Sequence, residues 1–482
     1  MNTYFNCHNH TMYSNLRLLD SINRPEELVN KAIELGLSGI AITDHECLSG
    51  HMEVNQLAKK LRETNPDFTI ALGNEIYLVE ERDKKIKYYH FILIAKDALG
   101  HKALRELSST AWYNSYHDSM ERVPVTKEEL ATIVNKYKGH LIATTACMGG
   151  ELSTHVVHYN NAHRVNDLTT AQHYYNLILQ FLQYCIDLFD DDFYLECAPS
   201  ERADQCSVNT TIGNISKAMG IPLIVGTDSH YLRPEDRFVH KAYLNSKDGE
   251  REVDDFYEFA YLMSPEECKS LLEHSFTSAE ADIIMNNSII MSKKIEWYSL
   301  ERNQIIPKVK VREYVKTLSY FGVNNIWSDE LTNWPNIKEL LVSDNLQERY
   351  WINQCLQGLL DKDLWNSTYI DRIETEANVI KYIGEQLDDC LFAYFNTFQH
   401  YIDLFWECGS IVGPGRGSAT GFLSNYLLGI TQLDPIKWEL PYWRFLNLER
   451  AELPDIDIDL APSKRPAIFE AIREERGEMG LI

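Results

Sequence analysis

The sequence lacks the features of a secreted protein, a membrane protein or a zinc ribbon. None of its ten cysteines forms a C-x-x-C pair, which argues against a zinc ribbon and against a disulfide framework. No stretch is long and apolar enough to span a bilayer. The N-terminus, Met1 to His10, has no basic region and no apolar run, so it is not typical of a secretory signal. These absences predict buried free thiols in a reducing cytoplasm.

Basic residues are few as well. The chain has 46 basic and 71 acidic residues, a formal charge of −25. Phosphate binding needs clustered Lys and Arg, so a large nucleic-acid footprint is not expected. Any DNA binding must rest on local sites or on parts outside this chain. The 482 residues, 44% apolar and 24% charged, suffice for two or three ordinary globular domains.

The first part of the chain alternates between short apolar runs and amphipathic stretches. Between Thr3 and about Tyr231 this alternation predicts an α/β fold with a largely parallel sheet, closed into a barrel. From about Ser264 the pattern is mostly helical, and strand signals return near 410–412 and 451–460. We expect a domain boundary near residue 285. The expected strands of the first part are 3–7, 38–43, 69–72, 91–95, 140–145, 193–196 and 221–225.

Residues with metal-ligating side chains recur just after these strands. His8 and His10 close the first strand two residues apart, so they face one side of an extended chain. Asp228 and His230 repeat that spacing after the last strand. In a barrel of parallel strands such residues converge on the carboxyl-end rim, where such folds keep their sites. Histidine and carboxylate ligands together suit Zn, Mn or Fe. The other candidates at this rim are Asp44, His45, Glu75 and Cys147.

A glycine-rich turn follows a short apolar run near residue 412. Its sequence runs Gly-Pro-Gly-Arg-Gly-Ser from Gly413 to Ser418, and a helix is expected at 421–428. Glycine lets the backbone approach a phosphate closely, and the free N–H groups at a helix start favour an anion. Arg416 and Ser418 can add side-chain contacts. A glycine turn that merely caps a helix is the alternative interpretation.

Three aspartates alternate with isoleucines shortly after this turn. In an extended strand Asp455, Asp457 and Asp459 share one face, and the isoleucines share the other. Crowded carboxylates repel one another unless they are protonated or bridged by cations. Paired Mg²⁺ ions would relieve the repulsion, as in enzymes that join or cut phosphodiesters. A solvated acidic edge strand is the alternative.

The rim motifs resemble those of PHP (polymerase and histidinol phosphatase) domains. The resemblance is carried by His-Asn-His-Thr from His8, Ile-Thr-Asp-His to His45, and Gly-Thr-Asp-Ser-His to His230. It implies a distorted (β/α)7-type barrel and a metal-dependent 3′–5′ exonuclease activity. Asp20 follows a longer loop than is usual, and His90 opens its apolar run rather than ending it. The ligand set implied by the resemblance is His8, His10, Asp20, His45, Glu75, His90, Cys147, Asp228 and His230.

The later motifs resemble the palm of the C-family replicative DNA polymerases, the DNA polymerase III alpha subunits. They are the Gly-Pro-Gly-Arg-Gly-Ser turn, Arg-Phe-Leu-Asn-Leu-Glu-Arg from Arg444, and Pro-Asp-Ile-Asp-Ile-Asp. The resemblance implies a PHP domain at 1–285 and the first part of an α+β, polymerase-beta-like palm at 286–482. It also implies Asp455 and Asp457 as catalytic ligands of Mg²⁺. The implied nucleotide-binding residues are Gly415, Arg416, Gly417, Ser418, Arg444 and Arg450.

The family's third catalytic aspartate, thumb and fingers have no counterpart in this sequence. We therefore expect a truncated or split polymerase whose substrates are dNTPs and primed template DNA. A second polypeptide would complete it and would carry the contact with a sliding clamp. The opening residues resemble those of phage-encoded versions, so we expect the protein to act in the cytoplasm of the phage's host. A stand-alone PHP phosphoesterase and a non-enzymatic structural subunit are the alternatives.

Overall fold

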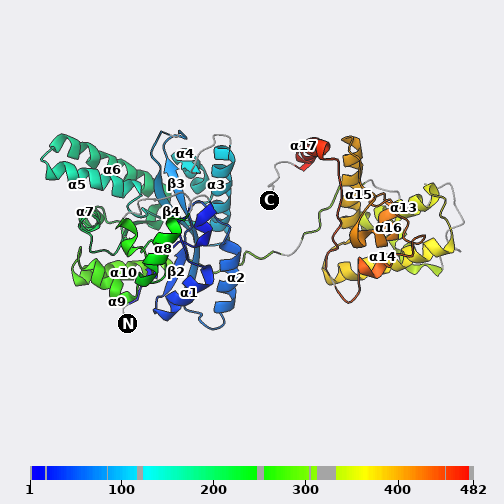
Figure 1. Ribbon diagram of the computed structural model, residues 1–482, viewed down its shortest axis with the longest axis horizontal. Coiled ribbons are helices and arrows are strands. Elements are labelled where there is room, and N and C mark those ends of the chain that lie inside the picture. Colours follow the sequence, from blue (N-terminus) through cyan, green and yellow to red (C-terminus); the bar gives the residue numbers. More distant parts are fainter. Residues whose placement is uncertain are drawn as a thin grey trace. The chain divides into compact units, whose positions relative to one another are not determined.

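The structure is a computed structural model in which the chain forms two compact units. It describes residues 3–16, 19–83, 85–116, 123–246, 255–302, 305–311, 333–450 and 452–476. The units divide between Arg302 and Asn303, and each has its own hydrophobic core. In Figure 1 the first unit runs from blue to green and the second from yellow to red.

The first unit is built around a barrel-shaped, nearly closed sheet. Its strand order is β1-β2-β3-β4-β6-β7-β8, with β5 paired to β3 beside this path. A bridge between Asn9 and Ser229 joins the segments that follow β1 and β8, so the first and last strands meet. Every expected strand is present, and β5 is an addition. The strands are β1 Phe5–Asn6, β2 Gly39–Ile42, β3 Thr69–Val79, β4 Tyr89–Ala95, β5 Pro124–Thr126, β6 Leu141–Thr144, β7 Phe193–Cys197 and β8 Leu223–Val225.

Strand β4 runs against its neighbours. It pairs antiparallel with both β3 and β6, whereas the other pairs along the sheet are parallel. The amino end of β4 therefore lies at the same rim as the carboxyl ends of the parallel strands. This direction explains why His90, near the start of β4, can join a site made by residues that follow other strands.

Both faces of the sheet are buried, as its continuous apolar runs require. Ile40 and Ile42 of β2 pack with Leu28 of the surrounding helices. The alternate residue Ala41 packs with Ile92 and other side chains that fill the inside of the barrel. The helices of this unit are α1 Pro25–Glu34, α2 His51–Leu61, α3 Ala98–Tyr116, α4 Lys127–Lys136, α5 Glu151–Arg164, α6 Leu168–Phe189, α7 Ala203–Met219, α8 Arg237–Leu244, α9 Pro265–Leu272 and α10 Ser278–Ser292.

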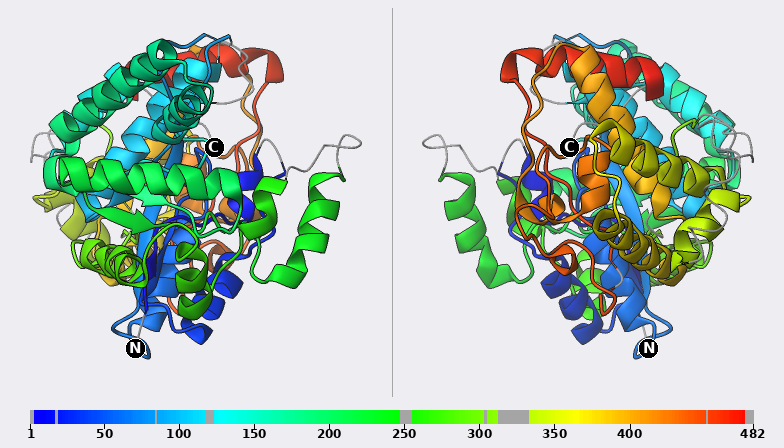
Figure 2. Two further views of the ribbon diagram at one scale, coloured as in Figure 1. Left: turned by 90° about the vertical axis from the view of Figure 1, so that its left-hand side faces the viewer. Right: turned by 90° about the vertical axis from the view of Figure 1, so that its right-hand side faces the viewer.

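Local signals set where these helices begin. Helix α1 starts with Pro25, whose missing N–H is not needed there, and acidic residues follow in its first turn. Helix α4 starts with a capping box between Thr126 and Glu129. Helices α5 and α6 pack side by side and extend away from the barrel (Figures 1 and 2).

The expected boundary near residue 285 falls inside helix α10. This helix belongs to the barrel, because Ser288 accepts a hydrogen bond from the N–H of Phe5 at 3.0 Å and Asn287 donates to the carbonyl of Leu223 at 3.0 Å. The chain leaves the first unit only after Arg302.

The described part of the second unit is mainly helical around a core that includes Trp351, Phe395 and Phe422. Of the expected strand at 451–460, residue 451 lies outside the described residues. Residues 452–459 form no regular strand, and only Leu460 pairs, through a bridge with Val412. No described helix of either unit has the length and apolar character that a membrane crossing needs. The helices are α12 Pro335–Val342, α13 Leu346–Asp361, α14 Ser367–Gln386, α15 Phe392–Glu407, α16 Leu423–Leu427 and α17 Arg465–Arg476.

Candidate functional site

The two histidines after β1 are fixed by the residue between them. Asn9 donates its backbone N–H to the hydroxyl of Thr43 at 3.1 Å and its side-chain amide to the carbonyl of Ala41 at 2.9 Å. His8 and His10 are both fully buried at the rim of the barrel. The backbone N–H of His10 donates to the carbonyl of Ser229, which brings the last strand beside the first.

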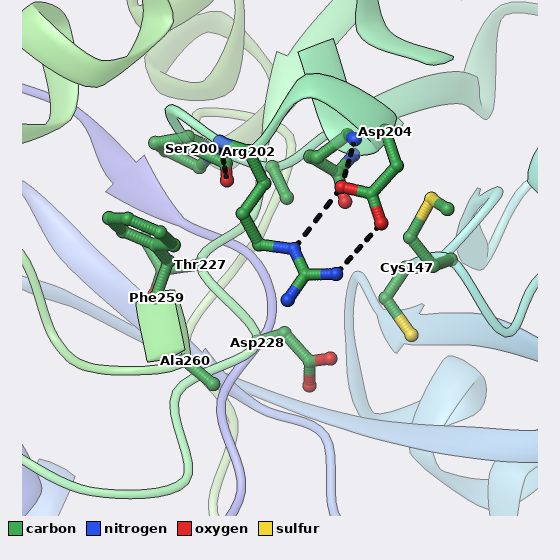
Figure 3. A pocket seen from close by; sticks show the side chains of 12 residues that line it. Cys147, Ser200, Arg202, Asp204, Thr227, Asp228, Phe259 and Ala260 are labelled. Carbon is green, nitrogen blue, oxygen red and sulfur yellow. Dashed lines mark hydrogen bonds and ion pairs between the residues drawn. The ribbon is translucent and has the colours of Figure 1, made fainter. Parts of the chain in front are cut away.

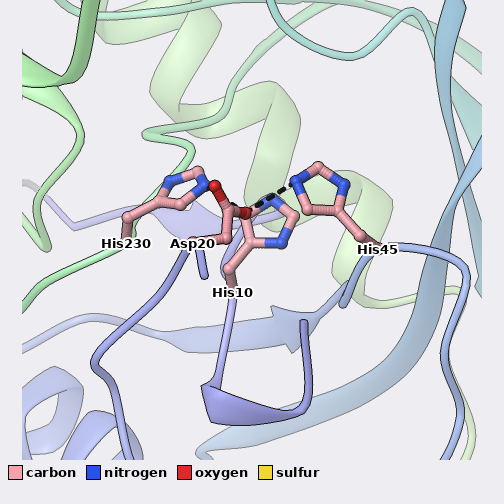
Figure 4. Close-up of side chains that lie close together, drawn as sticks. All are labelled: His10, Asp20, His45 and His230. Atoms are coloured by element: carbon pink, nitrogen blue, oxygen red, sulfur yellow. Dashed lines mark hydrogen bonds and ion pairs between the residues drawn. The ribbon is translucent and has the colours of Figure 1, made fainter. Parts of the chain in front are cut away.

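One group of ligand-type side chains surrounds Asp20 (Figure 4). Asp20 Oδ2 lies 2.8 Å from Nε2 of His45 and 3.0 Å from Nε2 of His230. The imidazole of His10 is the fourth member of the group. The longer loop before Asp20 thus returns this carboxylate to the rim, where the hydroxyl of Tyr257 donates to its other oxygen at 3.0 Å.

A second group surrounds Glu75, which lies inside β3 rather than after it. The expected end of this strand at residue 72 is wrong, because β3 continues to Val79 alongside β4. Glu75 Oε1 is 3.0 Å from Nδ1 of His90 and 3.3 Å from Nε2 of His8. Glu75 Oε2 is 2.7 Å from Nδ1 of His45 and 3.4 Å from Nε2 of His10. One carboxylate therefore links the residues of several strands.

Asp228 and Cys147 complete the cluster from its other side, and both line the pocket that Figure 3 shows. Asp228 Oδ1 lies 3.1 Å from Nε2 of both His8 and His10. Cys147 Sγ is more peripheral, at 3.7 Å from Nδ1 of His90 and 4.0 Å from Oε1 of Glu75. The structure thus gathers the whole expected ligand set at one rim.

The donor atoms of this cluster fit a divalent cation. His45 Nδ1, Glu75 Oε2 and Asp228 Oδ1 are buried and make no hydrogen bond. Buried polar atoms normally have a partner, and an unmet one calls for an ion or another explanation. Imidazole nitrogens and carboxylate oxygens are the donors that Zn, Mn and Fe take in proteins.

The histidines of the cluster have strongly shifted pKa values. Burial lowers the pKa of His8, but the surrounding carboxylates, Asp228 foremost, outweigh burial and raise it well above its ordinary value. The pKa of His45 is raised against burial by Tyr77, Glu75 and Asp20, and that of His230 by Asp20 and Asp228. Burial and the neighbouring His45 and His230 lower the pKa of His10 to about 3.

The carboxylates show the complementary shift. Burial raises the pKa of Glu75, but His90 and the other imidazoles around it outweigh burial and hold the pKa well below its usual range. His230 and His45 do the same for Asp20. Without a cation, the anionic carboxylates therefore alternate with the protonated rings of His8, His45 and His230, while the His10 ring is neutral.

Glu196, at the end of β7, supports the cluster and was not among the predicted residues. Its Oε1 lies 2.8 Å from Nδ1 of His8, and its Oε2 accepts the hydroxyl hydrogen of Thr144 at 2.5 Å. A carboxylate on the far nitrogen of a ligating histidine fixes the orientation of the ring. The signal was present in the sequence, because Glu196 ends an expected strand at the same rim. Asp44 has another role, accepting from the N–H of Thr11 at 2.6 Å to shape the loop after β1.

In the second unit the glycine turn and the aspartates lie together. Arg416 Nη2 is 3.1 Å from Oδ1 of Asp457, and Arg416 Nε is 3.4 Å from Oδ1 of Asp459. The N–H of Gly413 donates to the carbonyl of Asp459 at 2.9 Å. Gly415 has φ +102°, and a Cβ there would lie 2.8 Å from Cγ2 of Thr431, so this position requires glycine.

The helix after the turn differs from the expected one. It is α16, Leu423–Leu427, preceded by a 3-10 turn at Gly417–Gly421. Its first N–H groups are already bound, because the buried carboxylate of Glu376 accepts from Leu423 at 2.7 Å and from Ser424 at 2.8 Å. This helix start is therefore closed to an outside anion. A phosphate would have to bind earlier, along 415–418.

The two later arginines are exposed and separate from the aspartates. Arg450 pairs with Glu452 at 2.6 Å, and Arg444 ends the 3-10 turn Tyr442–Arg444. Among the described residues neither arginine forms an ion pair with Asp455 or Asp457. Asp455 is exposed and Ile456 is buried, whereas Asp457 and Ile458 are both half-buried, so the expected alternation of faces holds only at the start of the segment.

Sequence comparison matches both units to known families. The PHP domain family matches residues 6–200, and the family described as the bacterial DNA polymerase III alpha NTPase domain matches residues 337–481. A DNA-directed DNA polymerase of Bacillus phage SPbeta is 36% identical over 500 residues, covering 99% of this chain. The chain is homologous to the N-terminal part of the C-family DNA polymerase III alpha subunits.

Two bacterial relatives support this family assignment. The DNA polymerase III alpha subunits of Campylobacter jejuni and Aquifex aeolicus are 28% and 29% identical over 99% and 98% of the chain. The chain spans only 37–38% of the length of these three relatives. The predicted family and the likeness to phage proteins are confirmed. Asp228 and His230 lie beyond the matched PHP range, so their membership of the site rests on the geometry described above.

Proposed function

We propose that this chain is the PHP and first palm portion of a replicative DNA polymerase, and that its PHP unit is a metal-dependent 3′–5′ exonuclease. The observation that supports the exonuclease best is the complete buried cluster of imidazoles and carboxylates, whose donor atoms lie close enough together to hold a cation. Zn²⁺, Mn²⁺ or Fe²⁺ bound there would activate a water molecule and neutralise charge on a phosphodiester.

The residues of the chain have distinct tasks in this hydrolysis. Glu75 and Asp20 bridge neighbouring imidazoles and would hold the ions in place. Glu196 orients His8. The oxygen of water attacks the phosphorus of the terminal phosphodiester, and the bond from phosphorus to the 3′ oxygen breaks. One proton of the water ends on that 3′ oxygen, so the products are a shortened strand and a nucleoside 5′-monophosphate.

A direct test uses the chain loaded with Mn²⁺ and a 5′-labelled oligonucleotide with a single-stranded 3′ end. We expect stepwise trimming that requires metal, and loss of trimming in Asp228→Asn. The exposed Asp187 on α6 gives a matched control, Asp187→Asn, which should trim like the wild type. Trimming at the wild-type rate in Asp228→Asn would refute the assignment and indicate a contaminating nuclease. Trimming would also rule out a purely structural role for the metals.

The polymerase assignment is supported by the contact of Arg416 with Asp457. It places a glycine turn suited to a triphosphate beside carboxylates suited to Mg²⁺. Asp455 and Asp457 would hold the ions, and Gly415, Gly417 and Ser418 would line the phosphates together with Arg416. Arg444 and Arg450 would approach the nucleotide from the nearby loop. Primed template DNA, dNTPs, a polypeptide carrying the thumb and fingers, and a sliding clamp bound through it are the proposed partners.

A further inference from the structure

Three polar side chains follow one face of helix α14 in the second unit. Tyr369, Arg372 and Glu376 have the spacing i, i+3 and i+7, which places them on one side of an α-helix. The side chain of Arg372 is only 15% exposed, and that of Glu376 is fully buried. A helix face that merely filled the core would be apolar at these positions. What the three side chains contact therefore indicates why they are polar.

Arg372 joins two segments that carry proposed nucleotide-binding residues. Its Nη2 donates to the carbonyl of Gly421, which ends the 3-10 turn after the glycine turn, at 2.5 Å. The same nitrogen donates to the carbonyl of Leu440 at 3.2 Å. Its Cζ lies 5.1 Å from the centre of the Tyr442 ring, in the 3-10 turn that ends at Arg444. One guanidinium thus contacts both segments.

The two segments also approach each other directly at Gly421. A Cβ at this position would lie 2.7 Å from the carbonyl oxygen of Pro441. Because that oxygen belongs to the backbone, any side chain at 421 would push the segments apart. The missing side chain therefore allows the separation that Arg372 fixes.

Tyr369 reaches the other side of the glycine turn through Asp434. Its hydroxyl donates to Oδ2 of Asp434 at 2.6 Å, while Oδ1 of Asp434 accepts from the N–H of Ile436 at 2.9 Å. Two residues before Asp434, the N–H of Gln432 donates to the carbonyl of Pro414, inside the glycine turn, at 2.8 Å. This face of α14 is therefore bonded to the segments that hold the glycine turn on both sides.

We propose that this face of α14 positions the nucleotide site of the second unit, with Arg372 setting the separation between the glycine turn around Arg416 and the segment of Arg444. The inference rests on the proposed polymerase and assigns positioning residues to it. Arg372 acts through the two other arginines and not on the phosphates, because its Nε and Nη2 are bound to Glu376 and to backbone carbonyls. A triphosphate that contacts both arginines needs them at the correct separation, and misplaced groups cost orders of magnitude in rate.

Titration calorimetry of the full chain with dTTP and Mg²⁺ measures the assembled site. Lysine keeps a charge beside Glu376, but its single ammonium cannot reproduce the planar fork of Arg372. Arg372→Lys should therefore weaken dTTP binding about 10-fold or more while the chain stays folded. Tyr369→Phe removes one hydroxyl and should weaken dTTP binding about 3-fold. The exposed Tyr382 on the same helix gives the matched control, Tyr382→Phe, which should bind like the wild type.

A double-mutant cycle separates positioning from a merely structural effect. If Arg372 acts by placing Arg444, then Arg444→Ala should cost much less dTTP affinity in the Arg372→Lys background than in the wild type, because coupled residues are not additive. Gly421→Ala should also weaken dTTP, since it moves the same segments without changing Arg372. In a mixture with the polypeptide that completes the polymerase, Arg372→Lys should raise the KM for dNTPs more than it lowers kcat.

The outcomes distinguish this inference from the proposed polymerase. Wild-type dTTP affinity in Arg372→Lys, additive losses in the cycle, or a wild-type chain that binds no dTTP would each overturn the inference. Primer extension with an unchanged KM in Arg372→Lys would overturn it too, while leaving the polymerase standing. Binding that follows the expected pattern, in a completed mixture that never extends a primer, would instead sink the polymerase and leave the positioning role of α14 in place.

Discussion

Oε2 of Glu75 lies 2.7 Å from Nδ1 of His45, and neither atom makes a hydrogen bond. The Glu75 side chain is fully buried and that of His45 nearly so. In the metal-free chain the two groups face each other as a buried ion pair, because the pKa of His45 is raised and that of Glu75 is lowered. A cation that takes the place of the proton would bind both groups only in the native fold, so metal binding and folding should be coupled.

Metal removal should destabilise the first unit. A ligand that binds only the native state, at a hundred times its Kd, adds about 2.7 kcal/mol to the free energy of unfolding. We expect a chain reconstituted with Mn²⁺ to lose stability of this order on chelation, and His10→Ala to lower the metal content. The exposed His163 supplies the control, His163→Ala. Thermal unfolding and elemental analysis check both points. A well-folded wild type that takes up no Zn, Mn or Fe would contradict the prediction.

Metal binding should release protons at pH 7. The pKa values of His8, His45 and His230 are raised by the groups around them, Tyr77 and carboxylates at His45 and carboxylates at the other two, so these rings hold protons in the metal-free chain. Ligating imidazoles must be neutral, so metal affinity should rise as the pH increases above about 6.5. Calorimetry in two buffers with different ionisation enthalpies measures the release. Equal heats in both buffers would show that no proton leaves.

The same shifts determine how the metal-free chain responds to pH. A histidine whose pKa is raised by folding stabilises the fold at pH values below its pKa in the unfolded chain, about 6.5. This contribution is lost as the pH rises through its pKa in the folded chain. The lowered pKa values of Asp20 and Glu75 act oppositely, so their contribution is lost at acid pH. We expect the metal-free chain to lose stability both at acid pH and at alkaline pH. The metal-loaded chain should lose stability chiefly at acid pH. Thermal unfolding across pH distinguishes the two forms.

Glu196 should tune the metal site without contacting the metal. Its carboxylate lies 2.8 Å from Nδ1 of His8 and raises the pKa of that ring. Loss of such a partner typically costs 10–100-fold in metal affinity. Glu196→Gln should therefore weaken Mn²⁺ binding by about that factor. The exposed Glu201, a few residues on, gives the control Glu201→Gln, and equal affinities in the two variants would exclude the role.

Much of the first unit follows from its sequence because the apolar runs of the strands are local. His8, His10 and Asp228 could be placed because they come directly after such runs. His90 could not, because the direction of β4 is set by pairing with β3 and β6, which leaves no local mark. Glu75 was placed after its strand because the turn signal that would end β3 at residue 72 is overridden by its long pairing with β4.

The second unit was harder to predict for a physical reason. The motif around Arg416 indicated a phosphate loop, but the anion at the start of α16 comes from Glu376, about fifty residues earlier. Nothing near Glu376 in the sequence marks a buried carboxylate. Its surroundings resemble any amphipathic helix, and only packing reveals that its partners are Arg372 and two backbone N–H groups.

Glu376 should matter for the stability of the second unit. It is fully buried, and Nε of Arg372 donates to it at 2.8 Å. Removal of one partner of a buried ion pair costs about 3–5 kcal/mol. Glu376→Ala should destabilise this unit by that amount and speed hydrogen exchange at the amides of Leu423 and Ser424. The exposed Glu385 on the same helix provides the control Glu385→Ala, and similar exchange in both variants would contradict the capping role.

Polymerisation should require more polypeptide than this chain. Two-metal phosphoryl transfer needs acidic groups that hold the ions about 3.5–4 Å apart, and misplaced reacting groups cost orders of magnitude in rate. The relatives named as polymerases are proteins of which this chain spans 37–38%. We expect no templated synthesis by the chain alone, and synthesis when a polypeptide carrying the thumb, fingers and remaining palm is added. Robust primer extension by the isolated chain would refute this.

Substitutions in the reconstituted mixture then separate the three aspartates. Asp455→Asn and Asp457→Asn should each lower primer extension at least about 100-fold, since a lost metal ligand removes several kcal/mol of transition-state stabilisation. Asp459→Asn is the matched control, because Asp459 lies on the same segment and also pairs with Arg416 but is not expected to hold metal. Arg416→Ala should chiefly raise the KM for dNTPs. If Asp459→Asn were as damaging as Asp457→Asn, the effect would come from the loss of the arginine contact rather than of a metal ligand. Extension that persists with both Asp455 and Asp457 replaced would place the catalytic ions elsewhere.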